Sequence, residues 1–302
     1  MNKRDWTGVI PAMTTPFRQD MAVDLDALRD KVRWLIESGC TGVVAAGSLG
    51  EGATLSLAEK RDVFRACREA AGNRGWVVAA IGSLSTADAV AQAEVAHAAG
   101  ADGLMVLPPY AYRSDWRETK AYFGAVFAAT PLSSMLYNNP VAYITDVTAR
   151  QMLELAAEQS NFHAVKESSG DVRRITALRE ICGDRLAPLV GVDDLIVEAV
   201  AAGAAGWIAG LANALPEESV RLFELARQGP SRELRDLYEW FLPLLRLDTV
   251  PKFVQLIKLV QAELGRGHAR VRPPRLGLAD AELSEALELI RAQLGTKFAA
   301  TR

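Results

Sequence analysis

The chain has 302 residues, half of them hydrophobic, and a formal net charge of −3 from 34 basic and 37 acidic residues. This length allows one large domain or two ordinary ones, and the near-neutral balance gives no reason to expect a nucleic acid or an anionic membrane as partner. The longest apolar runs are far too short to span a membrane, and residues 1–8 lack the apolar core of a signal peptide. We therefore expect a cytoplasmic protein with no membrane partner.

Short β-rich runs alternate with amphipathic segments as far as residue 229. Asp24 precedes apolar residues at helical spacing, and the pairs Ser56/Glu59 and Ser85/Asp88 have the form of capping boxes. Strand then helix, repeated eight times, predicts a parallel sheet covered by helices, and eight units in roughly 230 residues match a closed (β/α)8 TIM barrel. The predicted strands are 8–13, 42–47, 76–82, 103–107, 134–137, 163–166, 188–192 and 206–209.

Other folds and other chemistries fit less well. A doubly wound sheet would have a glycine-rich dinucleotide loop after its first strand, and residues 10–16 (Ile-Pro-Ala-Met-Thr-Thr-Pro) are not one. The few cysteines and histidines are widely spaced, so we expect a reduced protein with neither a metal site nor a Ser-His-Asp triad. They are Cys40, Cys67, Cys182, His97, His163 and His268.

The alternation stops after Gly229 and Pro230. Residues 231–245, 250–265 and 279–294 have the pattern of three helices, with two prolines between the last two. We therefore predict a barrel with the catalytic site in residues 1–229. Residues 230–302 are predicted to form a helical extension packed on that barrel and no independent domain.

Lys166 ends a short apolar strand, just before a loop rich in serine and glycine. Apolar surroundings penalise the ammonium and favour the neutral amine, which is the form that attacks a carbonyl. The alternative is a lysine that snorkels to solvent or pairs with a nearby carboxylate.

Three other strand ends would meet Lys166 at the mouth of a barrel, where the chemistry of this fold lies. Residues 47–51 (Gly-Ser-Leu-Gly-Glu) form a turn whose amides could hold a carboxylate, or an ordinary glycine-rich turn. Tyr137 is either a proton donor and acceptor or an interior aromatic residue. Residues 206–210 (Gly-Trp-Ile-Ala-Gly) offer bare backbone either to a ligand or to a packed helix.

Together these motifs resemble the dihydrodipicolinate synthase/N-acetylneuraminate lyase family of (β/α)8 class I aldolases and dehydratases. Residues 47–51 are similar to its Gly-x-x-Gly-Glu signature, and residues 137–140 (Tyr-Asn-Asn-Pro) to its Tyr-Asn-x-Pro. Residues 166–170 (Lys-Glu-Ser-Ser-Gly) are similar to its Schiff-base lysine motif. The resemblance runs from Thr7 to the C-terminal helices.

The resemblance implies roles for these residues and no cofactor beyond a covalent imine. Lys166 would form the imine with a 2-oxo acid, and Tyr137 would relay protons. Ser48 would hydrogen-bond that tyrosine, while the amides of Ser48 and Leu49 hold the substrate carboxylate. Gly191 and Ile208 would line the site through backbone groups. The family also implies a homotetramer, a dimer of dimers.

Departures from the family pattern narrow the substrate. The synthase that condenses pyruvate with aspartate semialdehyde has an arginine where this chain has Ala142, and a threonine where it has Leu49. Its second tyrosine of Pro-Tyr-Tyr, which reaches the neighbouring subunit's site, is Ala111 here, with Tyr112 as a candidate replacement. Lysine-biosynthetic activity is therefore not expected.

Residues 137–143 (Tyr-Asn-Asn-Pro-Val-Ala-Tyr) are most similar to family members of hydroxyproline catabolism. Those deaminases convert 1-pyrroline-4-hydroxy-2-carboxylate to 2-oxoglutarate semialdehyde. Two alternatives stay open. The first is another Schiff-base enzyme of the family: a dihydrodipicolinate synthase-like enzyme, a sugar-acid dehydratase or a 2-oxo-acid aldolase. The second is a catalytically silent barrel that binds a metabolite.

Overall fold

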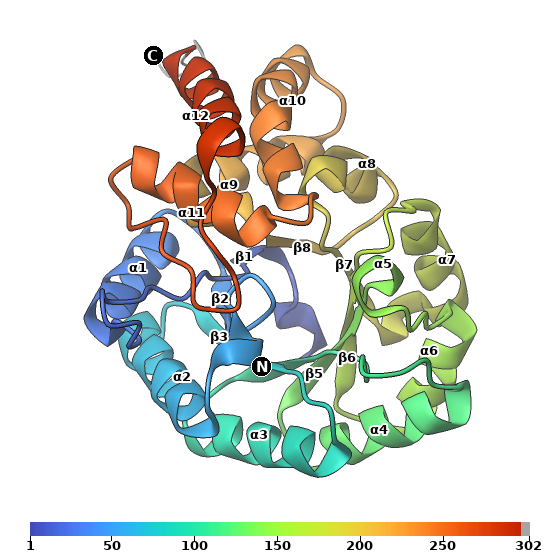
Figure 1. Cartoon of the computed structure of the whole chain (residues 1–302). Helices are drawn as coiled ribbons and strands as arrows, with labels where there is room; N and C mark the ends of the chain where they lie inside the picture. Colours follow the sequence, from blue (N-terminus) through green and yellow to red (C-terminus); the bar gives the residue numbers. More distant parts are fainter. Residues whose placement is uncertain (297–302) are drawn as a thin grey trace.

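The structure, a computed structural model, describes residues 1–296 and contains an eight-stranded parallel sheet with the strand order β1-β8-β7-β6-β5-β4-β3-β2 (Figure 1). A bridge between Ala12 and Val44 brings β1 to β2, so the sheet forms a barrel, as the sequence predicts. The strands are β1 (Gly8–Pro11), β2 (Gly42–Ala45), β3 (Trp76–Ile81), β4 (Gly103–Val106), β5 (Ser133–Asn138), β6 (Phe162–Glu167), β7 (Ala187–Val190) and β8 (Gly206–Ala209).

Almost every strand residue is buried, because helices cover the outside of the sheet and side chains fill its interior. β8 has the predicted bounds, and most other strands end one or two residues earlier than predicted. β5 and β6 instead continue to Asn138 and Glu167. These two polar residues pair in register, and the Asn138 amide donates to the Glu167 carboxylate at 3.1 Å.

The outer ring consists of helices that begin at side-chain caps in most cases. At α2, Ser56 and Glu59 form the reciprocal capping box that the sequence predicts. At α3, Ser85 caps the helix, but the shorter Asp88 bonds to the serine hydroxyl and the second half of the box is missing. The ring comprises α1 (Leu25–Glu37), α2 (Leu57–Ala71), α3 (Thr86–Ala98), α4 (Trp116–Ala128), α6 (Ala149–Glu158), α7 (Arg173–Cys182), α8 (Ile196–Ala201) and α9 (Pro216–Gln228), while α5 (Pro140–Tyr143) is a single turn after β5.

The three predicted C-terminal helices are present as α10 (Arg232–Leu245), α11 (Phe253–Glu263) and α12 (Asp280–Gly295). Figure 1 shows them grouped on one side of the barrel, beyond β1 and β8. Before α11, the short 3₁₀ turn η6 (Arg246–Asp248) and residues 249–252 turn the chain back across the barrel mouth.

Polar contacts attach this C-terminal region to the barrel. The Lys258 ammonium on α11 lies 2.5 Å from the Glu51 carboxylate, and both side chains are almost fully buried. Thr14 donates to the amide oxygen of Gln261 at 2.8 Å. None of the helices within residues 1–296 is long and apolar enough to cross a membrane.

Candidate active site

A cavity of about 620 Å³ opens at the carboxyl ends of the strands. This is the end of the barrel that carries the chemistry of the fold. All six residues predicted for the site line it: Ser48, Leu49, Tyr137, Lys166, Gly191 and Ile208.

Lys166 is held inside this cavity and is only 6% exposed. Its ammonium nitrogen lies 4.1 Å from the centre of the Tyr137 ring, on the neighbouring strand. Burial lowers the pKa of Lys166, while Asp248, Tyr143 and Asp193 act in the opposite direction. Since the neutral amine is the nucleophile, burial favours the reactive form.

Gly191 makes room for the lysine. A Cβ atom at this position would lie 2.2 Å from Cε of Lys166, which is far inside van der Waals contact. The absence of a side chain at Gly191 therefore decides where the Lys166 side chain can run.

Tyr137 is buried, and its hydroxyl accepts a hydrogen bond of 3.1 Å from the side-chain amide of Asn139. Burial raises the pKa of Tyr137, and the Asn139 hydrogen bond opposes the rise. The carbonyl oxygen of the same Asn139 side chain accepts from the Ala142 amide and caps α5. One asparagine thus orients Tyr137 and fixes the turn that follows it.

Ser48 does not hydrogen-bond Tyr137, contrary to the expectation from the sequence. Its hydroxyl is hydrogen-bonded to Tyr143, which ends α5 and whose ring stands edge-on to that of Tyr137 with centroids 5.7 Å apart. The Asn139 amide already occupies the Tyr137 hydroxyl, and the turn of α5 brings Tyr143 to Ser48 instead. Burial raises the pKa of Tyr143 to about 12.

The turn at residues 47–52 is folded tightly on itself. A Cβ at Gly52 would lie 1.8 Å from the Ala46 carbonyl oxygen, so only glycine fits there. Neither the Ser48 nor the Leu49 amide donates a hydrogen bond to any other residue of the described chain. Both therefore remain available as donors for a ligand in the cavity.

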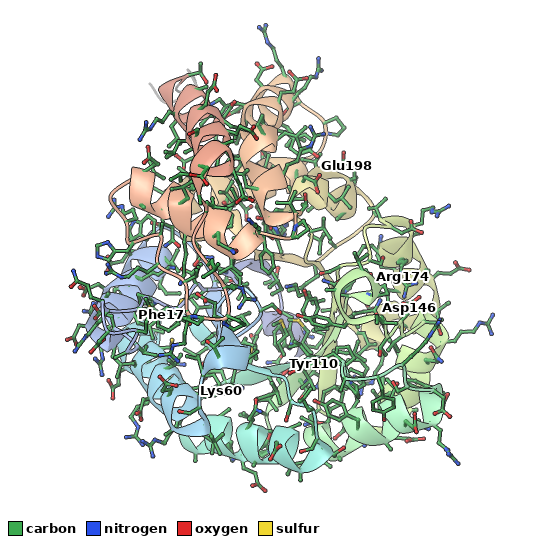
Figure 2. All side chains as sticks on the ribbon, viewed as in Figure 1. Phe17, Lys60, Tyr110, Asp146, Arg174 and Glu198 are labelled. Atoms are coloured by element: carbon green, nitrogen blue, oxygen red, sulfur yellow. The ribbon has the colours of Figure 1, made fainter. Side chains whose placement is uncertain are left out.

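Ion pairs fix the end of β6, next to the cavity. The Glu167 carboxylate, next to Lys166 in the chain, accepts from Arg174 at 3.1 Å, and Arg174 also bonds to Asp146 at 2.8 Å. Figure 2 shows Asp146 and Arg174 side by side near α5. These contacts hold the end of the lysine strand against the loop that follows β5.

Two acidic residues near the lysine were not predicted from the sequence. Asp193 is fully buried and accepts from the Trp207 indole at 2.9 Å and from the amides of Gly210 and Leu211. Asp248 comes from η6, far along the chain, and lines the same cavity. The pair of aspartates after β7 was a possible signal for Asp193, whereas no local pattern marks Asp248.

Two positions bear on the substrate. Ala142, where the biosynthetic enzymes have an arginine, lines the cavity, but so does Arg275, a cation that the sequence analysis missed. Tyr112 is 53% exposed and does not line the cavity of its own chain. No cluster of three potential metal ligands is found among residues 1–296.

Comparisons with known proteins agree with this architecture. The model of the dihydrodipicolinate synthetase family matches residues 5–293. A 4-hydroxy-tetrahydrodipicolinate synthase of Chelativorans sp. (strain BNC1) is 32% identical over 288 residues, which cover 95% of this chain and 98% of that protein. The crystal structure of a dihydrodipicolinate synthase from Bacillus anthracis has a TM-score of 0.91 at 26% identity, covering 97% of this chain and 99% of that one. A prophage protein of the dihydrodipicolinic acid synthase family from E. coli K12, solved in complex with pyruvate, has a TM-score of 0.89 at 25% identity, covering 96% and 99%.

Proposed function

The chain belongs to the dihydrodipicolinate synthetase family, and on this basis we propose that it deaminates 1-pyrroline-4-hydroxy-2-carboxylate through an imine at Lys166. Members of this family are class I lyases that use a covalent lysine Schiff base and neither a metal nor a soluble cofactor, and this chain is an enzyme of that class. The substrate and the roles of individual residues are the proposal.

The observation that supports it best is the position of the Lys166 amine. It is buried, lies 4.1 Å from the Tyr137 ring centre and faces a cavity large enough for a five-carbon acid. The proposed substrate is already a cyclic imine of a 2-oxo acid. Attack by the neutral amine at C2 forms a new carbon–nitrogen bond to Lys166, and the ring nitrogen leaves as a primary amine on C5, which opens the ring.

The remaining steps use the lysine imine as electron sink. Loss of a proton from C3 gives an enamine, and the enamine expels the 4-hydroxyl as water. Proton transfers move the new double bond to C4 and C5, where water releases ammonia and leaves an aldehyde. A second water frees the semialdehyde from Lys166, so one water is consumed per turnover overall.

Two phenols are proposed to move these protons. Tyr137 lies over the lysine, and Tyr143 lies against Tyr137 and is hydrogen-bonded to Ser48. We propose that Tyr137 exchanges protons with the imine carbon chain, while Tyr143 and Ser48 connect it to the cavity mouth. This arrangement uses residues of one chain and does not need Tyr112.

The free amides of Ser48 and Leu49 are proposed to hold the single carboxylate of the substrate. Gly191 and Ile208 also line the cavity, where bare or apolar surface suits the carbon chain. The substrate has only one carboxylate and needs no second carboxylate-binding residue. This agrees with Ala142, which stands where the biosynthetic enzymes have an arginine.

A second candidate is 4-hydroxy-tetrahydrodipicolinate synthase activity, after which relatives at 31–34% identity are named. Arg275 favours it, because an arginine in the cavity can bind the carboxylate of a second substrate. Sugar-acid dehydration or 2-oxo-acid aldol cleavage would use the same lysine.

The test has two parts. Incubation with pyruvate and borohydride, followed by peptide mapping, is expected to place the adduct on Lys166. Ammonia and semialdehyde are then measured with the pyrroline substrate. An adduct on another lysine rejects the site, whereas an adduct on Lys166 without ammonia release rejects only the substrate.

Assembly as a homotetramer is also proposed, from the family resemblance alone. Light scattering of the purified protein tests it. A monomeric and fully active enzyme would contradict it and would fit a site completed within one chain.

A further inference from the structure

Asp248 brings a carboxyl group from outside the barrel into the cavity of Lys166. It ends η6, between α10 and α11, and lines the cavity together with the lysine. A Cβ at Gly210 would lie 2.1 Å from Oδ1 of Asp248. The carboxyl group therefore rests directly on the bare backbone that follows β8.

The two carboxyl groups near Lys166 have opposite environments. Asp193 accepts hydrogen bonds from the Trp207 indole and from two backbone amides, as an ionised carboxylate does. Asp248 Oδ1 is shielded from solvent and has no hydrogen-bond partner within residues 1–296, although the residue as a whole is partly exposed. A buried, unpaired oxygen of this kind is costly unless a ligand or a bound proton completes it.

The charges around Asp248 favour its protonated form. Burial raises the pKa of Asp248 well above its ordinary value, and the negative charges of Asp193 and Asp194 act in the same direction, while Lys166 opposes them. Burial also raises the pKa of Asp193, but only to about 6, because the amides and the indole stabilise its charge. When the environments of two neighbouring carboxyl groups separate their pKa values, one group can act as a proton donor while the other stays ionised. Here Asp248 is the candidate donor and Asp193 the ionised group.

The proposed reaction needs such an acid, because hydroxide is a poor leaving group. Tyr137 and Tyr143 are both hydrogen-bonded to other side chains, and the pKa of Tyr143 is raised to about 12, which makes it a weak donor near neutral pH. Asp248 is the cavity acid without a hydrogen-bond partner in the described chain.

We propose that Asp248 is the general acid that protonates the 4-hydroxyl of the substrate as the C4–O bond breaks. The Oδ1–H bond of Asp248 breaks, the proton joins the departing oxygen, and the bonding pair of C4–O leaves with it as water. The enamine electrons form the C3–C4 double bond, and Asp248 regains its proton from solvent. This inference rests on the proposed function and extends it to substrates with a hydroxyl at C4.

The experiment separates imine chemistry from hydroxyl loss in Asp248→Asn. Pyruvate has no leaving group, so adduct formation at Lys166 and deuterium exchange into its methyl group are expected to fall far less than ammonia release. Release of ammonia from the pyrroline is expected to fall by about two to four orders of magnitude. Asp194→Asn, which removes a neighbouring charge outside the cavity but leaves the Asp248 carboxyl group in place, serves as the matched control and is expected to retain most of both activities.

A pH profile adds a readout that a merely structural role would not change. In wild type, hydroxyl loss relative to pyruvate exchange should decline as pH rises through the pKa of Asp248, because the acid form disappears. Asp248→Glu, which retains a carboxyl group, should keep a declining limb, and Asp248→Asn should not. The cations and phenols that also line the cavity are unchanged in all these variants: Arg275, Lys166, Tyr137 and Tyr143.

Three results would overturn the inference. Ammonia release that survives in Asp248→Asn removes the role directly. An equal loss of pyruvate exchange and ammonia release would mean that Asp248 only positions Lys166. If wild type catalyses deuterium exchange into pyruvate but does not react with the pyrroline, the proposed substrate is wrong. The comparison is then repeated with an open-chain 4-hydroxy-2-oxo acid. Hydroxyl loss that is absent with this substrate, or independent of Asp248, rejects Asp248 as the general acid as well.

Discussion

The hydroxyl of Ser48 is hydrogen-bonded to the phenol of Tyr143, which joins the loop after β2 to the turn after β5 across 95 residues of sequence. Tyr143 in turn stands edge-on to Tyr137, above the buried amine of Lys166. One hydrogen bond and two ring contacts therefore connect the turn at residues 47–52 to the lysine, and all of these residues belong to a single subunit.

Tyr143→Phe tests this connection. We expect deuterium exchange into pyruvate to fall by roughly two orders of magnitude, because the phenylalanine keeps the ring but breaks the proton path. Adduct formation at Lys166 should persist. Ser48→Ala should add little to Tyr143→Phe, since residues that act through one path are not additive. Tyr112→Phe, on an exposed tyrosine outside the cavity, is the control, and an equal loss there would point to a neighbouring subunit's site.

The pH dependence of imine formation follows from the lysine. Burial lowers the pKa of Lys166, and the amine attacks only when neutral, so the rate should rise with pH and level off below the value of about 10.4 of an exposed lysine. The check is the initial rate of reductive trapping with pyruvate between pH 6 and 10, with modification of the exposed Lys252 as internal reference. A rate still climbing at pH 10 would show that burial does not govern Lys166.

Tyr137→Phe removes the hydroxyl that we propose as a proton carrier while preserving the ring next to Lys166. Turnover is expected to drop by about two to four orders of magnitude, with some adduct still formed. Tyr238→Phe is a suitable control, because the hydroxyl of Tyr238 is also hydrogen-bonded but lies on α10, outside the cavity. Unchanged turnover in Tyr137→Phe would leave Tyr143 as the main proton carrier.

The barrel could be predicted from the sequence because each apolar strand is followed by a segment with helix signals. The carboxyl ends of β5 and β6 were predicted one residue too early, because the polar residues Asn138 and Glu167 suggest a loop. Only the register of β5 on β6 places these two side chains opposite each other and lets their hydrogen bond extend the strands.

The sequence predicted the cavity-lining residues that lie at strand ends, such as Lys166 and Tyr137. The sequence did not predict the hydrogen-bond partner of Ser48, because the position of α5 determines which of the two nearby tyrosines reaches the serine hydroxyl. Asp248 lies well beyond β8, and no periodicity predicts that the chain before α11 turns back over the barrel mouth. Contacts of this kind depend on tertiary packing alone.

The division into a barrel of residues 1–229 and an extension of residues 230–302 is a proposal that stability can test. Lys258 on α11 forms a buried ion pair with Glu51 of the barrel. Lys258→Met should cost about 3–5 kcal/mol in free energy of unfolding, because it leaves Glu51 charged and buried. The matched control is Lys252→Met, whose partner Glu282 is exposed, with an expected change of about 0–1 kcal/mol.

Urea denaturation followed by circular dichroism measures both variants. A single cooperative transition is expected in wild type, and a truncated chain ending at residue 229 should not fold. A stable barrel without the extension, or two separate transitions, would show that the extension is a domain of its own.

The last prediction concerns the choice of substrate. The chain should release ammonia and a semialdehyde from 1-pyrroline-4-hydroxy-2-carboxylate faster than it condenses pyruvate with aspartate semialdehyde. Ala142 lacks the arginine of the biosynthetic enzymes, and a missing charge-assisted contact costs roughly 1.5–3 kcal/mol, or about one to two orders of magnitude in kcat/KM. Arg275 is the one feature of the described cavity that acts against this expectation, since it could replace that contact.

Both assays are run on one preparation, for wild type and for Arg275→Ala. If condensation is slow in both and the pyrroline releases ammonia, Ala142 accounts for the slow condensation and the deaminase assignment is supported. If condensation is the faster reaction in wild type and is lost in Arg275→Ala, Arg275 takes the role of the arginine that is absent at position 142, and the chain is a synthase. If neither reaction proceeds but a sugar acid loses water, the lysine chemistry stands and the cavity beyond Lys166 selects a longer hydroxylated chain.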